Sequence, residues 1–124
     1  MSYALRVMLI AVGLAALTAA AIAFAPRVTD VTVVAQTPNG ANVALDSPVT
    51  VTFSRPVDTR SAERAFLLYP PVKGRFLWRD QTLVFQPAES LRPRTSYSVT
   101  IRPGLRDARG YINRAMTSWP FSTQ

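Results

Sequence analysis

The sequence predicts an all-β fold, a β-sandwich or barrel of about seven short strands that follows one N-terminal apolar helix. Short runs of β-branched and aromatic residues alternate with polar residues, and turn-forming residues separate these runs at intervals of about eight to twelve positions. The clearest run is 49–58, where Val49, Val51 and Phe53 share one face and Pro56 ends the strand. A chain of 124 residues without a visible repeat suits one domain.

The first part of the chain contains an uncharged apolar stretch at 7–25, between Arg6 and Arg27. As a helix it would span about 28 Å, close to the roughly 30 Å of a bilayer's hydrocarbon core. It is apolar on all sides, which argues against a buried helix of a soluble domain. We expect either an uncleaved transmembrane anchor with a cytoplasmic N-terminus or a cleaved signal peptide. The residues that could precede a cleavage site are Ala21, Ala23 and Ala25.

Two features favour the anchor. The apolar stretch is longer than a signal-peptide core of about 7–15 residues, and Pro26 is a poor residue to follow a cut. The expected division is a signal anchor or signal peptide at 1–26 and a β domain at 27–124. We expect the β domain to be delivered across the membrane, so that it is anchored outside the cytoplasm at the cell surface or, if the first segment is cleaved, secreted.

The remaining strands follow from the same alternation. They are expected at 28–36, 41–45, 72–79, 82–86, 94–101 and 116–123. Gly74 is expected to mark a bend or bulge, and Asp80 with Gln81 a hairpin turn. In the last strand, Pro120 must direct its missing donor to a sheet edge or a bulge.

One short helical turn is expected between the strands. Asp58 or Thr59 would cap it, and it would end near Ala65. Residues 66–68 then form an apolar anchor. The inward-facing positions of the strands and this anchor give the expected core: Val31, Val33, Val49, Val51, Phe53, Phe66, Phe76, Trp78, Leu83, Phe85, Tyr97, Val99, Ile101, Trp119 and Phe121.

The chain has no cysteine and no histidine, which excludes disulfides and the usual catalytic triads. A carboxylate pair is still available, but the aspartates lie at turns or strand ends, where they serve turn chemistry. These aspartates are Asp30, Asp46, Asp58, Asp80 and Asp107. The loop at 107–110 could offer oxygens to Ca²⁺, but Arg106 and Arg109 flank its one carboxylate, so arginine pairing or loop capping is expected instead. We expect no enzyme, no catalytic or metal-binding residue and no cofactor.

The net charge is +7, and every basic residue except Lys73 is an arginine. This excess indicates either attraction to an anionic partner or a solvated basic surface, and the scattered arginines favour the second. The candidate interaction surface consists of Arg75, Arg79, Arg92, Arg94, Arg102, Arg106 and Arg109. Alternation places Phe76 and Trp78 on the face opposite Arg75 and Arg79, which predicts core and solvated face rather than a stacking surface for nucleic acid.

The motifs, in their order, resemble the SbsA-type bacterial Ig-like domain family. The resemblance covers about residues 30–123 and rests on the motifs at 38–43, 49–58, 74–78, 82–87, 91–99, 107–110 and 119–123. Within them, Tyr97 follows Leu91 and Pro93 as the tyrosine does in the tyrosine corner of Ig-like sandwiches, where its hydroxyl bonds to the preceding backbone. The chain differs from the family in having one copy behind one apolar segment and a proline in the last strand.

The resemblance implies an Ig-like antiparallel β-sandwich without a catalytic set. It predicts a non-catalytic module of the cell envelope with a structural, spacer or protein-interaction role. One alternative is a binding module for an anionic cell-wall polymer or glycan, through the arginines. Another is an accessory subunit whose edge strand near Pro120 pairs with a partner. The expected partners are the membrane, through 7–25, and envelope proteins or wall polymers, with no small-molecule substrate and no nucleic acid.

Overall fold

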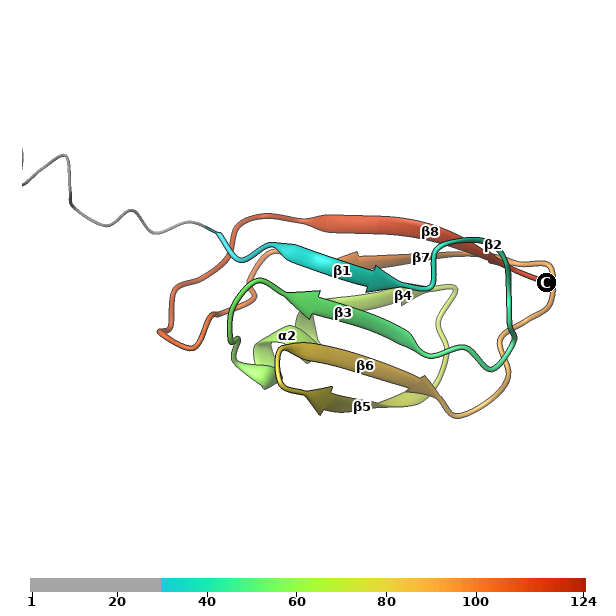
Figure 1. The fold of residues 1–124 in the computed structure, drawn as a ribbon, viewed down its shortest axis with the longest axis horizontal. Helices are drawn as coiled ribbons and strands as arrows, with labels where there is room; N and C mark the ends of the chain where they lie inside the picture. Colours follow the sequence, from blue (N-terminus) through green and yellow to red (C-terminus); the bar gives the residue numbers. More distant parts are fainter. Residues whose placement is uncertain (1–29) are drawn as a thin grey trace, which may run out of the picture.

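The computed structural model describes residues 30–124, and the predicted anchor or signal segment at 7–25 lies outside them. The described chain forms eight strands and one short helix (Figure 1). These are β1 (Val33–Thr37), β2 (Gly40–Val43), β3 (Val49–Phe53), α2 (Thr59–Ala65), β4 (Phe66–Tyr69), β5 (Gly74–Arg79), β6 (Thr82–Pro87), β7 (Ser96–Ile101) and β8 (Thr117–Thr123). Within residues 30–124, no helix has the length and apolar character needed to cross a membrane.

The strands form two four-stranded sheets that face each other (Figure 1). One sheet has the order β1-β3-β6-β5 and the other β2-β8-β7-β4. The chain changes sheets between β1 and β2, at the cis bond before Pro38. As a result β1 pairs antiparallel with β3, whereas β2 pairs parallel with β8. The predicted all-β sandwich is confirmed, with this one parallel pair in addition to the antiparallel ones.

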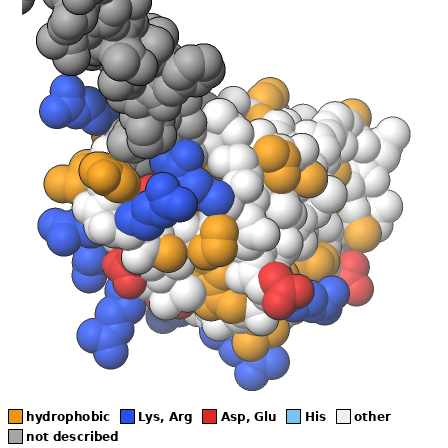
Figure 2. Space-filling model, turned by 60° about the vertical axis from the view of Figure 1, so that its left-hand side comes forward, with side chains coloured by type: hydrophobic (Ala, Val, Ile, Leu, Met, Phe, Trp, Pro, Cys, Tyr) orange, Lys and Arg blue, Asp and Glu red, His pale blue; other side chains and the backbone are white. Residues whose placement is uncertain are grey.

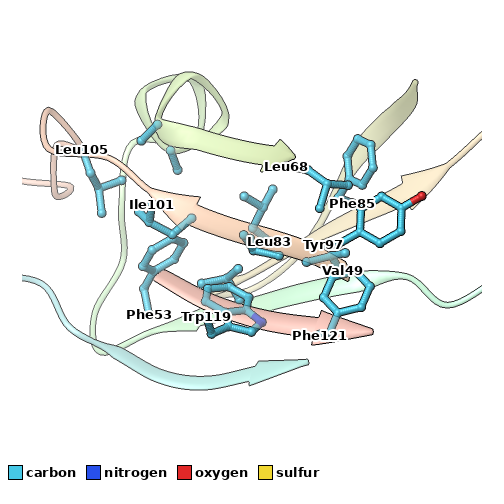
Figure 3. Close-up of a cluster of buried hydrophobic side chains, with 14 of the residues drawn as sticks. Val49, Phe53, Leu68, Leu83, Phe85, Tyr97, Ile101, Leu105, Trp119 and Phe121 are labelled. Carbon is cyan, nitrogen blue, oxygen red and sulfur yellow. The ribbon is translucent and has the colours of Figure 1, made fainter. Parts of the chain in front are cut away.

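The core lies between the inner faces of the two sheets (Figure 3). Val49, Val51 and Phe53 are buried, as their alternation predicts, and the adjacent threonines are only half-buried. Four predicted core residues are only partly buried and pack against the cluster from its margin: Val33, Phe66, Phe76 and Trp78. The cluster also includes residues that were not predicted: Val43, Ala62, Ala65, Leu68, Leu91 and Leu105.

Aromatic pairs form within one sheet and between the two sheets, and they close the margin of the core. Tyr97 stacks on Phe121 with ring centroids 5.3 Å apart. Phe66 from one sheet stacks on Phe85 from the other at 5.3 Å, and Phe76 lies 5.5 Å from the same ring. Such pairs add to the stabilisation from apolar burial, since ring edges and faces carry opposite partial charges.

Several predicted elements are confirmed. The Asp58 carboxylate accepts the N–H of Ser61 at 3.1 Å and so caps α2, which satisfies one of the unpaired donors at the helix start. The Tyr97 hydroxyl accepts the N–H of Arg92 at 2.9 Å, which is the predicted tyrosine corner. Asp80, with φ of 52°, forms the hairpin turn between β5 and β6.

Three predictions need correction. Of the strand predicted at 28–36, residues 28 and 29 lie outside the described part of the chain; β1 begins at Val33, because the N–H of Val31 bonds to the Asn113 side chain rather than to a strand. Residues 66–68 are not only an anchor but the start of β4, which pairs with β7. Gly74 marks no bulge, because its pairing with Pro87 continues the regular β5–β6 register. A side chain there would instead overlap the carbonyl oxygen of Gln86 and the ring of Phe85.

Pro120 does not interrupt the last strand. It pairs with Ser98, and β8 is continuous on both sides of it. The N–H of Thr123 is donated to the Thr95 carbonyl, on the side of β8 that faces β7. Successive backbone nitrogens of a strand point to alternate sides, so the nitrogen of Pro120, three residues earlier, points to the side that faces β2. There the pairing with β2 begins only at Phe121, and the missing donor therefore costs no bond in that ladder.

Tyr97→Phe tests the tyrosine corner. Removing the hydroxyl leaves the N–H of Arg92 without its acceptor, and we expect a loss of about 1–2 kcal/mol in the free energy of unfolding. Denaturant unfolding followed by tryptophan fluorescence measures it. Tyr69→Phe, at an exposed tyrosine on β4, is the matched control and should leave stability unchanged. Equal values for the two variants would contradict the structural role of the corner.

Gly74→Ala tests the close approach of β5 to β6. The added methyl group would meet a backbone carbonyl that cannot move independently of the strand, so we expect a loss of about 1–3 kcal/mol in the free energy of unfolding. The same denaturant titration applies. Lys73→Ala, at the exposed neighbouring position, should change stability by less than about 0.5 kcal/mol. A neutral Gly74→Ala variant would show that this space is larger than described.

Candidate functional site

The sandwich has two ends, and the described chain begins at one of them. We call this the proximal end, formed by the start of β1, the end of β3, α2, the β5–β6 turn and residues 102–116 between β7 and β8 (Figure 1). The pairs Val33↔Phe53 and Ile101↔Thr117 place these elements together. The C-terminal Gln124 lies at the opposite, distal end, where its carbonyl accepts the N–H of Arg94 at 2.9 Å.

The structure divides the seven arginines of the predicted interaction surface between the two ends. Arg79, Arg102, Arg106 and Arg109 lie at the proximal end, whereas Arg75, Arg92 and Arg94 lie at the distal end. All seven are exposed. Four further arginines lie at the proximal end and were not predicted as part of the surface: Arg55, Arg60, Arg64 and Arg114. The seven therefore do not form one continuous site, and the proximal end holds the larger group.

Residues 102–116, which we call the proximal loop, are fixed by three buried side chains. Leu105 joins the hydrophobic core. Asn113 accepts the N–H of Val31 at 3.0 Å and donates to the Val31 carbonyl at 3.2 Å, so its amide takes both backbone positions of one residue. The third is Asp107. The sequence predicted a capping or pairing role for Asp107, but not its distant partner. It did not predict the roles of Leu105 and Asn113, because their contacts lie far away in the sequence.

The side chain of Asp107 forms several polar contacts at the proximal end. It is 3% exposed, and its Oδ1 accepts the N–H groups of Arg109 at 2.9 Å and Tyr111 at 3.0 Å. Its Oδ2 lies 3.2 Å from Nε of Arg55, at the end of β3. The carboxylate therefore joins the proximal loop to the other sheet. Both expected roles, loop capping and arginine pairing, are present, but the partner is Arg55 rather than the flanking arginines.

The same contacts shift the pKa of Asp107. Burial of the carboxyl would raise its pKa, but the hydrogen bonds from Tyr111 and Arg109 and the charge of Arg55 outweigh burial. The pKa of Asp107 therefore lies below its ordinary value of 3.8. The carboxylate stays charged in the folded protein and acts as a structural clamp rather than as a proton donor.

The outer side of the proximal loop is apolar as well as basic. Tyr111, Ile112 and Met116 are 50%, 56% and 65% exposed. They project from a loop whose inner positions are buried, so their exposure follows from the way the loop is fixed. Figure 2 shows the proximal end, where basic side chains, here arginines, lie among hydrophobic ones beside the point at which the described chain begins.

Two open hollows flank the proximal loop. One, of about 560 Å³, is lined by α2 and the loop and includes Arg64, Arg102 and Met116. The other, of about 610 Å³, lies beside Asp58 and Arg106. Among residues 30–124, no group of three or more carboxylates could hold a metal ion.

Comparison with known proteins gives the family. A family model described as bacterial Ig-like domain matches residues 24–123. The chain belongs to the bacterial Ig-like domain family. No curated protein sequence matches it.

Similar solved structures show where such Ig-like domains occur. The chain is 31% identical to an L,D-transpeptidase from Mycobacterium smegmatis, with a TM-score of 0.56, over 77% of this chain and 40% of that one. It is 27% identical to an L,D-transpeptidase solved in complex with imipenem, with a TM-score of 0.56, over 78% and 40%. The first six domains of the surface layer protein SbsC match at 17% identity and a TM-score of 0.55, over 77% and 14%, which shows a shared fold alone.

These matches cover only part of the similar proteins. The chain spans about 40% of the length of the L,D-transpeptidases. The shared part is an Ig-like β-sandwich, and the activity in the names of those proteins is not thereby an activity of this chain.

Asp107→Asn tests the clamp through the pH dependence of stability. Because the pKa of Asp107 is lower in the folded state, the unfolded chain binds the proton more tightly than the folded chain. The stabilisation from Asp107 is therefore complete above its ordinary pKa. It is lost as the pH falls through the folded-state pKa. We expect the native protein to lose stability progressively as the pH falls below about 5. The Asp107→Asn variant should be less stable at neutral pH and should show a shallower loss.

Urea unfolding at a series of pH values measures this difference. Asp46→Asn, at an exposed turn of the distal end, is the matched control and should follow the native curve. Parallel curves for the native protein and Asp107→Asn would rule out the clamp as a source of acid sensitivity.

Proposed function

We propose that this chain is a non-catalytic Ig-like module displayed on the outer side of the cytoplasmic membrane, with a structural, spacer or protein-interaction role. The observation that carries the proposal is the family match over residues 24–123, which extends across the whole sandwich and leaves only the apolar N-terminal part outside it. We also propose that the chain is an SbsA-type member of the family, on the motifs at 38–43 and 49–58.

The chemistry of the described residues supports a non-catalytic role. With neither histidine nor cysteine in the chain, the commonest acid–base and nucleophilic groups are missing, and carboxylates are the main alternative. Asp107 is held as a structural anion, and Asp58 caps α2. Asp46 lies at the distal end, away from the other four aspartates. Asp58 and Asp107 both line the hollow of about 610 Å³, but each accepts backbone N–H groups, as a helix cap and as a loop clamp.

The proposed placement rests on the apolar stretch at 7–25. Its length matches a bilayer's hydrocarbon core, and Arg6 before it is consistent with a cytoplasmic N-terminus. The sandwich would then lie outside the cytoplasm. A domain with no cysteine needs no disulfide chemistry to fold there, since its stability comes from the core between the sheets.

A fractionation experiment tests anchoring and placement. We expect the full chain, expressed in a bacterial host, to stay in the membrane pellet after alkaline carbonate extraction, and a variant lacking residues 7–25 to be soluble. Protease added to spheroplasts should digest the full chain while a cytoplasmic marker survives. A full chain that is soluble, or that is protected until the cells are lysed, would contradict the proposed placement.

The alternative role, binding an anionic wall polymer, predicts a different result. Binding of the full chain in nanodiscs to purified wall polymer should fall steeply as salt rises, because counterions compete for the polymer's charges. The division of the predicted arginines between two ends speaks against one extended polymer site. Salt-insensitive association with an envelope protein would instead support the protein-interaction role.

A further inference from the structure

We propose that the proximal end is a membrane-facing surface, and that Tyr111, Ile112 and Met116 with the surrounding arginines rest on the interface of a bilayer that contains anionic phospholipids. This rests on the proposed anchoring by residues 7–25 and goes beyond it. Anchoring alone would leave the sandwich free to swing on its tether. The proposal gives the sandwich a fixed, end-on orientation.

The short segment between the apolar stretch and the sandwich supports a bilayer as the partner of this surface. Only residues 26–29 separate the apolar stretch from Asp30, which is at the proximal end. Even a fully extended chain spans at most about 3.6 Å per residue, so the proximal end can lie no farther than roughly 18 Å from the end of that stretch. The headgroup layer extends for several ångströms beyond the hydrocarbon core, which brings this end within reach of the interface.

The composition of the surface fits a lipid interface. Tyrosine is favoured at the headgroup level, where its ring is in apolar surroundings and its hydroxyl in water. Ile112 and Met116 offer apolar side chains with no hydrogen-bonding group to satisfy. Arginines next to them can place their stems along the acyl chains and their guanidinium groups among the phosphates.

The charges of the proximal end are arranged to favour anions. Three of its acidic side chains make bonds within the protein: Asp107 clamps the loop, Asp58 caps α2, and Asp30 lies 3.5 Å from the N–H of Arg114. Glu63 on α2 and Asp80 at the β5–β6 turn also lie at this end, so among the described residues it holds eight arginines and five carboxylates. Six of the exposed arginines at this end are Arg60, Arg64, Arg102, Arg106, Arg109 and Arg114. Of these, Arg102 also donates from its guanidinium group to the carbonyl of Arg64. The hollow lined by Arg64, Arg102 and Met116 combines two cations with an apolar side chain, as a phospholipid headgroup and its first acyl carbons require.

The rigidity of the proximal loop makes the surface effective. Leu105, Asp107 and Asn113 fix the loop from the inside, so the exposed side chains need little further ordering when they contact a bilayer. A preformed surface loses less conformational entropy on binding than a mobile one.

The test uses the full chain in nanodiscs and exploits the absence of cysteine. Ala115→Cys, in the proximal loop, and Ala88→Cys, at the distal end, each introduce a single thiol for a fluorescent label at an exposed position. We expect the label at 115 to be shielded from a water-soluble quencher in discs with equal parts phosphatidylglycerol and phosphatidylcholine. The label at 88 should stay accessible. Equal accessibility of the two labels would overturn the proposal.

Charge variants test the arginines. Each arginine near an anionic surface is expected to change the docking equilibrium about fivefold, so replacing Arg106, Arg109 and Arg114 by Gln should weaken it about a hundredfold and expose the label. The matched control replaces Arg75, Arg92 and Arg94 by Gln, which removes the same charge from the distal end. Similar effects of the two triple variants would contradict a proximal docking surface.

The apolar part is tested separately. The double variant of Tyr111→Ser and Ile112→Ser should expose the label even in anionic discs, whereas Tyr69→Ser should not. Tryptophan fluorescence of Trp119 during denaturant unfolding checks that each variant is folded. Discs of phosphatidylcholine alone should show weaker shielding at 115, and shielding that is unchanged without anionic lipid would overturn the assigned role of the arginines.

Failure of the two proposals gives different results. If residues 7–25 do not anchor the chain, it separates from the discs during purification. If anchoring is correct but docking is not, the chain stays with the discs and the two labels are equally quenched. Shielding at 115 that appears only after addition of an anionic polysaccharide would assign the surface to a wall polymer and overturn the membrane proposal.

Discussion

The contact between the inner faces of the two sheets holds this molecule together. The chain contains no cysteine, so no disulfide joins the sheets, and a domain of this size depends on the apolar surface that it buries. Val49, Val51 and Val99 are fully buried at its centre, and Tyr97 stacks on Phe121 beside them. Hydrogen bonds and one ion pair cover the two ends of this apolar core. The tyrosine corner covers the distal end, and the Asp107 and Asn113 contacts cover the proximal end.

Polar groups at the two ends of the sandwich fix the positions of the loops, whereas the apolar layer holds the two sheets together. Burial is non-directional and allows the sheets to slide, whereas hydrogen bonds fix the order and position of the loops. The Asn113 amide forms hydrogen bonds with the N–H and the carbonyl of Val31. These two bonds fix the position of the chain just before β1. The Asp107 carboxylate then fixes the proximal loop to the end of β3. Both contacts are long-range in sequence and short in space, and they give the proximal end a defined shape.

The sequence predicts the parts of this structure that local chemistry determines. Alternation at 49–53 identifies β3 and its buried face, and the spacing of Leu91, Pro93 and Tyr97 identifies the tyrosine corner. It does not reveal β4, because Phe66, Leu67 and Leu68 are consecutive apolar residues without alternation. Nor does it reveal the Asp107–Arg55 pair, whose members are 52 positions apart in the sequence. The candidate interaction surface was predicted from charge alone. In the structure its arginines lie at both ends of the sandwich, because the direction of each strand decides at which end an arginine lies.

The positions of Asp30 and Gln124 at opposite ends of the sandwich have a mechanical consequence. A force applied between these two points acts along the strands rather than across them. The β1–β3 and β2–β8 pairs would then be loaded in shear, so that the hydrogen bonds of each ladder resist together instead of opening one after another. The two ends of the described chain are thus placed so that a stretching force would load the ladders in shear, which is the geometry in which their hydrogen bonds act together.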